Sequence, residues 1–216
     1  MCILKLILIF IASILSNTAF SAEYREIQSK FGPFASASKT EYLHPVLKVS
    51  VGTSGLKLNE LHFSIRARQG DITLSVASDG NVRFPISDNL YQENPPFETN
   101  APKGSLSFSV GLEVSTQPIQ RFNYDLYYKM ADEYTTWTKS EAGFLARMHM
   151  PGPKALLIRF PIGTHGRATV HLPSGSKVLE TDSKNEIRIE HNDEWKRIDP
   201  MISLNTMPDR IEMSVK

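Results

Sequence analysis

The last third of the chain repeats an earlier stretch, and this internal similarity limits the possible folds more than any other feature. Leu179–Val215 aligns with Leu74–Val110 without a gap at a spacing of 105 residues, and eight of the 37 aligned positions are identical. Differing positions often stay apolar, as in Val82/Ile187 and Phe84/Ile189. Self-similarity at a fixed spacing is typical of chains built from repeated structural units. The sequence therefore predicts two diverged copies of one unit.

Each copy reads as one helix followed by strands. Aromatic and apolar residues recur at helical spacing in two places, Tyr24/Ile27/Phe31/Phe34 and Tyr127/Met130/Tyr134/Trp137. Gly32-Pro33 should end the first helix near Phe31, whereas the second can run from about Tyr124 to Lys139. Residues 62–68 and 167–172 read as strands, the first alternating between apolar and polar side chains as a half-buried antiparallel strand does.

Two short turns should connect neighbouring strands of the copies. Ser78-Asp79-Gly80-Asn81 is a strong hairpin signal. Lys184-Asn185 occupies the same place in the second copy, where asparagine can adopt the left-handed conformation that glycine would otherwise supply. We predict a mainly β (α+β), sandwich-like fold of two tandem repeats, residues 22–116 and 121–216, each with one helix and about five mostly antiparallel strands. Two tandem domains and one pseudo-symmetric domain both fit this pattern.

The N-terminus predicts export. A short start containing Lys5 precedes the apolar run Leu6–Leu15, and small residues at Ala19 and Ser21 suit cleavage after Ser21. We therefore expect residues 1–21 to be a signal peptide, and the mature protein to be soluble and either periplasmic or secreted. The only cysteine, Cys2, would be removed with it, so the mature chain would hold no disulfide.

Charge and hydropathy argue against a nucleic-acid-binding protein and against an integral membrane protein. The chain has 24 basic and 23 acidic residues, and removal of residues 1–21 takes away one lysine and no acid. A balanced chain has no electrostatic footprint for nucleic acid. No second apolar run is long enough to cross a bilayer, so we do not expect an integral membrane protein.

The motifs of common enzymes are missing. The chain has no G-x-S-x-G, no H-E-x-x-H, no C-x-x-C and no glycine-rich phosphate loop. Two S-x-x-K quartets, Ser36–Lys39 and Ser174–Lys177, lack the companion boxes of the enzymes that use this motif, and the second surrounds a turn. We assign no catalytic residue, no metal ligand and no cofactor.

Residues kept in both copies are expected to specify the fold, because a fold has to be encoded in each copy whereas a site is seldom needed twice. The polar or turn-forming matches are Arg83/Arg188, Asp88/Asp193, Pro95/Pro200 and Asn100/Asn205. We expect the arginine and aspartate of each copy to pair and fix the connector, with asparagine and proline holding its turns. A ligand-facing arginine is the functional alternative.

Features found in one copy are better indicators of a binding site. They include Glu93, Asn94, the stretch Phe144–Met150, and aromatic residues that could meet a ligand, namely Tyr124, Tyr127, Tyr128 and Trp137. An aromatic stripe at helical spacing is, however, usually the face that packs on a sheet.

Three hypotheses on function follow. The first is a non-catalytic binding or interaction module of the cell envelope, whose partner is another envelope protein or a small ligand. The alternative is a hydrolase or carbohydrate-active enzyme using a carboxylate pair, for which Glu93, Asp125, Asp132 and Glu133 are possible members. The third is a structural component that oligomerises through exposed strand edges.

Overall fold

The computed structural model describes residues 19–52, 56–141 and 150–215. Nearly all of the expected signal peptide, residues 1–18, and most of Phe144–Met150 therefore lie outside the described residues. The chain divides into two compact units. Unit 1 comprises the chain up to Lys39 together with His44–Leu112, and unit 2 comprises Thr40–Leu43 together with Glu113–Lys216. The sheets are mostly antiparallel, which confirms the predicted β-rich α+β class.

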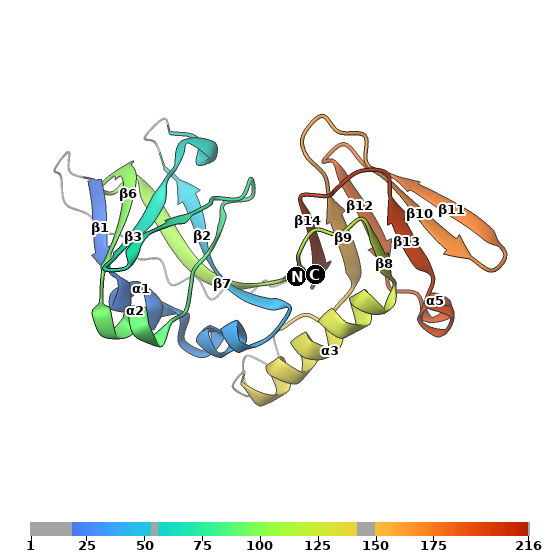
Figure 1. The fold of residues 1–216 in the computed structure, drawn as a ribbon, viewed down its shortest axis with the longest axis horizontal. Helices are drawn as coiled ribbons and strands as arrows, with labels where there is room; N and C mark the ends of the chain where they lie inside the picture. The colour runs from blue at the N-terminus through green and yellow to red at the C-terminus, as the bar shows by residue number, and fades with distance from the viewer. Residues whose placement is uncertain (1–18, 53–55, 142–149, 216) are drawn as a thin grey trace. The chain divides into compact units, whose positions relative to one another are not determined.

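Unit 1 contains two sheets with a helix at their end (Figure 1). One sheet has the strand order β1-β6-β3-β4, and the other has the order β5-β2-β7. Its elements are β1 (Ala19–Glu23), α1 (Tyr24–Phe31), η1 (Gly32–Lys39), β2 (Leu43–Val51), η2 (Leu58–Glu60), β3 (Phe63–Ala67), β4 (Gly70–Leu74), β5 (Asn81–Arg83), α2 (Asp88–Glu93), β6 (Pro96–Pro102) and β7 (Leu106–Thr116), the last of which continues into unit 2.

Unit 2 has one sheet of order β11-β10-β13-β8 and another in which β9 lies between β12 and β14. The end of β7 also belongs to this unit, where Ser115 and Thr116 pair with β14. The elements are β8 (Arg121–Asn123), α3 (Asp125–Ser140), β9 (Ala155–Arg159), β10 (Arg167–Leu172), β11 (Gly175–Glu180), β12 (Glu186–Glu190), α5 (Asp193–Ile198), β13 (Met201–Leu204) and β14 (Arg210–Ser214).

Apolar alternation builds the core of unit 1. Phe63 and Ile65 of β3 are buried, and they join Leu47 of β2 and Phe97 of β6 in one cluster. The rings of Phe63 and Phe97 stack with their centroids 5.5 Å apart. Both sheets thus contribute to a single core, which is the arrangement that stabilises layered β structure.

The predicted helices and turns are present. Helix α1 covers Tyr24–Phe31 and ends at Gly32, whose φ is +48°. Helix α3 covers Asp125–Ser140, close to the predicted bounds. Gly80 and Asn185 both have positive φ, +82° and +58°, in the two predicted hairpin turns. In the part of the chain that the structure describes, no helix has the length and apolar character needed to cross a membrane.

Candidate functional site

Unit 1 contains an apolar cavity of about 190 Å³. It lies beside helix α1 and the pair of strands β1 and β6, and strands β2 and β7 complete its wall. Its apolar lining consists of Ala22, Ile27, Leu47, Leu106, Phe108 and Val110. Pockets for drug-sized ligands usually measure about 300–1,000 Å³. This cavity is therefore suited to a few apolar side chains and is small for a large organic cofactor.

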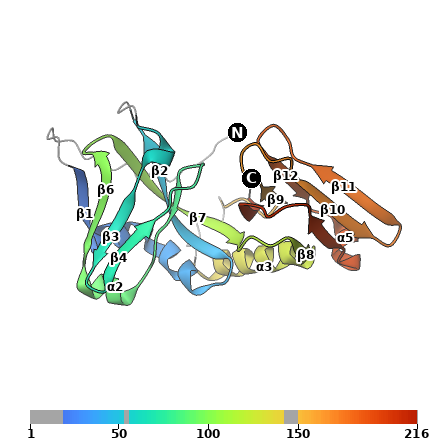
Figure 2. The same cartoon turned by 45° about the horizontal axis from the view of Figure 1, so that its top comes forward.

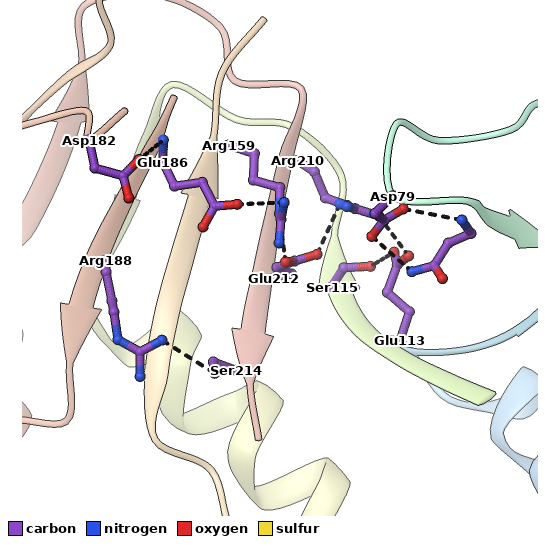
Figure 3. Close-up of polar contacts among 11 residues, drawn as sticks. Asp79, Glu113, Ser115, Arg159, Asp182, Glu186, Arg188, Arg210, Glu212 and Ser214 are labelled. Atoms are coloured by element: carbon purple, nitrogen blue, oxygen red, sulfur yellow. Dashed lines mark hydrogen bonds and ion pairs between the residues drawn. The ribbon is translucent and has the colours of Figure 1, made fainter. Parts of the chain in front are cut away.

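A row of ion pairs crosses the second sheet of unit 2 (Figure 3). Arg159 of β9 binds Glu186 of β12 at 2.5 Å and Glu212 of β14 at 2.7 Å. Arg210 binds the second oxygen of Glu212 at 2.9 Å and also binds Glu113 of β7 at 3.0 Å. We call these five residues the charge ladder.

The charge ladder is largely shielded from water. The side chain of Glu113 is 5% exposed and that of Glu212 is 13% exposed. Burial raises the pKa of Glu212, and the neighbouring Arg210 and Arg159 oppose that rise. The Oε1 atom of Glu113 accepts a hydrogen bond from the Ser115 hydroxyl at 2.6 Å. Both oxygens of each of these two glutamates are therefore engaged, so the ladder is built to hold four strands together and not to present a reactive carboxyl group.

The predicted aromatic residues of unit 2 lie mostly in the core. Tyr124, Tyr127 and Trp137 are 0%, 1% and 4% exposed. Burial raises the pKa of Tyr124 and of Tyr127, the latter to about 12. A ligand could reach none of these three rings without a rearrangement of the core.

Tyr128 is half-buried and is the one of the four aromatic residues that lies near polar surface groups. Its hydroxyl is 3.3 Å from Nδ1 of His191, and Nε2 of His191 is 3.2 Å from Oδ1 of Asp193. The pKa of Tyr128 is raised by burial first and by Asp193 second. A phenol with a raised pKa is a weak nucleophile, so this chain of contacts does not resemble an activated catalytic group.

The two asparagines that match in the sequence alignment each bond the segment that leads into a neighbouring strand. Asn100 accepts a hydrogen bond from the backbone N–H of His62 at 2.9 Å and donates to the carbonyl oxygen of Glu60 at 2.8 Å. Asn205 accepts from the backbone N–H of Arg167 at 2.7 Å and donates to the carbonyl oxygen of His165 at 3.0 Å. Each asparagine side chain thus supplies hydrogen-bond partners to backbone N–H and carbonyl groups of its own unit.

The shared prolines and aspartates also serve the backbone. The carbonyl oxygens of Pro95 and Pro200 accept hydrogen bonds from the N–H groups of Tyr24 and Tyr124, at 3.0 and 3.1 Å. Asp88 and Asp193 are the first residues of α2 and α5, where a negative charge is favourable.

The expected pairing of the shared arginine with the shared aspartate is wrong in unit 2. Arg188 instead binds Glu190 at 2.5 Å. Residues two apart on a strand face the same side, which brings Arg188 and Glu190 together, whereas Asp193 has already entered the next helix. Arg83, its counterpart in unit 1, lies on β5 with an exposed side chain.

None of the carboxylates considered for an enzyme is among the residues that line the cavity. Glu93 accepts the backbone N–H of Arg68, and Glu133 accepts those of Glu41 and Tyr42. Asp125 forms an ion pair of 2.9 Å with Lys129 one turn along α3, and Asp132 is exposed on the same helix. These residues therefore do not form a facing acid–base pair.

The second S-x-x-K quartet lies at the turn between strands β10 and β11. Ser174 lies in the turn before β11, and Lys177 lies within that strand, as its position around a turn predicts. His171 contacts the Ser203 hydroxyl at 2.7 Å on an exposed surface of the sheet. Among the described residues, no group of three or more histidine, cysteine, aspartate or glutamate side chains is placed to hold a metal ion.

Two features of the structure could not be read from the sequence. The charge ladder joins residues that are up to 99 positions apart, from Glu113 to Glu212, and the cavity depends on how β1 and β7 pack beside α1. Comparison of the chain with protein-family models, curated proteins and solved structures found no match.

Proposed function

We propose that this protein is an exported, non-catalytic binding module of the cell envelope, released by removal of residues 1–21. The observation that carries this proposal is the apolar cavity of unit 1. A concave surface that is mostly apolar favours binding over reaction, because chemistry needs positioned acids, bases or nucleophiles. The charged residues of the lining are Glu26, Lys30 and Lys103. The charge ladder, Glu93, Asp125 and Glu133 bind partners within the protein, which supports the same view.

We also propose that the two units are diverged copies of one ancestral unit. Hydrogen bonds recur at the 105-residue spacing: the bonds of Asn100 to residues 60 and 62 recur as bonds of Asn205 to residues 165 and 167. The helix ends agree as well, since Asn94 and Asp199 both adopt positive φ at the C-caps of α2 and α5. The strand orders β1-β6-β3-β4 and β8-β13-β10-β11 correspond element by element.

The spacing is not constant along the chain, and its changes locate insertions. The Tyr24 hydroxyl donates to Pro85 O and accepts from Ser87 N–H, while the Tyr124 hydroxyl donates to Glu190 O and accepts from Asn192 N–H. The residue numbers of the corresponding partners differ by 105, whereas those of the two tyrosines differ by 100. The helices therefore correspond at a spacing of 100, and not at the spacing of 103 that their aromatic stripes indicate.

The proposed duplication helps to locate a binding site, because it distinguishes residues that specify the fold of both units from residues found in one unit alone. The matched asparagines and prolines are occupied with backbone groups of their own units, so a binding role falls to features that differ between the copies. Strand β6 continues through Ala101 and Pro102, whose counterparts in unit 2 lie outside β13, and Pro102 lies in the wall of the cavity. The cavity is thus bordered by a segment in which unit 1 departs from unit 2.

The proposal can be tested in a diderm bacterium that expresses the full chain. A photo-crosslinking amino acid at Val110, which lines the cavity, should capture a partner in the periplasmic fraction. The same group at Ser107, exposed on the same strand, is the matched control and should not. Equal capture at both positions, or retention of the chain in the cytoplasm, would contradict the proposal. Turnover of a glycoside or ester panel by the purified protein would favour the hydrolase or carbohydrate-active alternative.

A further inference from the structure

Strand β1 spans the bond at which we expect the leader to be cut. It pairs with β6 through Ala19↔Pro102, Ser21↔Glu98, Ala22↔Phe97 and Glu23↔Pro96. Cleavage after Ser21 removes three of its five residues. The remaining two stay anchored, because Tyr24 N–H donates to Pro95 O at 3.0 Å. Processing would therefore shorten an edge strand without detaching α1.

Removal of these residues leaves part of β6 with one neighbour. On its other side β6 pairs with β3 through Phe63↔Thr99 and Ser64↔Glu98. Asn100 N–H donates toward that side, to His62 O at 3.3 Å. Neighbouring residues of a strand point their N–H groups in opposite directions, so Thr99 N–H faces the β1 side. Thr99 is only 5% exposed. A shielded amide that loses its neighbouring strand is a favourable place for a new strand to pair.

The cavity lies directly beside this edge. Ser21 and Ala22 form part of its wall, and Pro102, Lys103 and Gly104 at the end of β6 form another part. Loss of Ser21 would open the wall toward the edge of β6. Figures 1 and 2 both draw β1 as the outermost strand of its sheet, next to β6, so shortening β1 would make β6 the edge strand over that length.

We propose that leader removal uncovers a peptide-binding edge, at which an extended apolar segment of a partner protein adds to β6 as an antiparallel strand and places a side chain in the cavity. Strand addition of this kind obtains affinity from backbone hydrogen bonds and specificity from pockets for alternate side chains. The occupant is argued from the structure itself, because the end of the leader already pairs with β6 in this way. The inference rests on the proposed export and cleavage.

The first measurement is the mass of the exported full-length product. A mature chain that begins at Ala22 meets the premise. A chain that keeps residues 19–21 would overturn both the cleavage site and this inference, whereas a chain that begins at Ala22 but fails the tests below would overturn this inference alone.

The second measurement is amide hydrogen exchange of the mature protein with a synthetic peptide of residues 17–21, Asn-Thr-Ala-Phe-Ser, because Ala22 and Glu23 keep their own places on β6. Without peptide, Thr99 N–H should exchange readily, and saturating peptide should slow it by roughly tenfold or more, since backbone pairing protects an amide. A scrambled peptide of the same composition is the control that leaves the protein unchanged. Slow exchange of Thr99 without peptide, or equal protection by both peptides, would refute the proposal.

The third measurement separates the cavity from the edge. Leu106→Gln places a polar group in the cavity wall, and Ser107→Gln makes a similar change at an exposed neighbouring position. We expect the first to weaken peptide binding roughly tenfold, in line with the loss of apolar contact, and the second to leave it unchanged. Protection of Thr99 that grows with protein concentration, together with dimers in light scattering, would assign the edge to a second copy and would overturn the peptide proposal.

Discussion

The charge ladder of unit 2 can be tested by replacing Arg159 with methionine, which retains much of the apolar stem and removes the charge. Arg159 is 28% exposed, and its partners Glu186 and Glu212 are 15% and 13% exposed. Removing one member of a shielded ion pair leaves the other charged and poorly solvated. Hydrogen bonds to charged groups contribute about 1.5–3 kcal/mol each, and partial exposure reduces that value. We expect Arg159→Met to lower the free energy of unfolding of unit 2 by about 2–3 kcal/mol.

Arg188→Met is the matched control on the adjacent strand. Arg188 pairs with Glu190 at the same distance of 2.5 Å, but the two side chains are 42% and 65% exposed. Exposed pairs contribute about 0–1 kcal/mol. Urea unfolding followed by tryptophan fluorescence suits this comparison, because both tryptophans of the chain, Trp137 and Trp195, belong to unit 2.

The pH dependence provides a second and independent readout. Burial raises the pKa of Glu212, and Arg159 opposes that rise, so the methionine variant should raise this pKa further. A carboxyl group whose pKa is higher in the folded state binds protons on folding, and its contribution to stability is lost as the pH rises. The deficit of Arg159→Met should therefore shrink between pH 7 and pH 5. Equal losses in the two variants, or a deficit that does not change with pH, would refute our account of the ladder.

Three further perturbations test other parts of the structure. Asn205→Ala should lower the stability of unit 2 by about 1–2 kcal/mol, because it removes both hydrogen bonds that join residues 165 and 167 to the strand end; an unchanged urea midpoint would contradict this. The pKa of Tyr24 is raised to about 12 mainly by burial, so the folded state should lose stability as the pH rises from 10 to 12. Spectrophotometric titration should show slow ionisation of a tyrosine coupled to unfolding. Ionisation of all tyrosines near pH 10 without unfolding would contradict this prediction. Gly80→Ala should cost about 2 kcal/mol or more in thermal or urea unfolding followed by circular dichroism, since φ is +82° and the new Cβ would lie 2.4 Å from the Val49 carbonyl oxygen. Gly152→Ala, which meets nothing within 4 Å, should be neutral and serves as its control.

The sequence by itself determined the features that depend on neighbouring residues. Alternation predicted a strand over residues 62–68, where β3 covers Phe63–Ala67. Gly32 marked the end of α1, and Asn185 replaced a glycine in a left-handed turn. Backbone preferences and apolar periodicity act over a few residues, so they can be read without knowledge of distant contacts. The β-rich α+β class follows from these local signals.

Only the tertiary structure decided which distant residues meet. Arg188 pairs with Glu190 and not with Asp193, and Glu113 reaches Arg210 across neighbouring strands. Strand register and burial set such contacts, and both arise from the packing of whole sheets. For the same reason the cavity beside β1 was absent from our sequence predictions, because its walls come from five elements that share no motif.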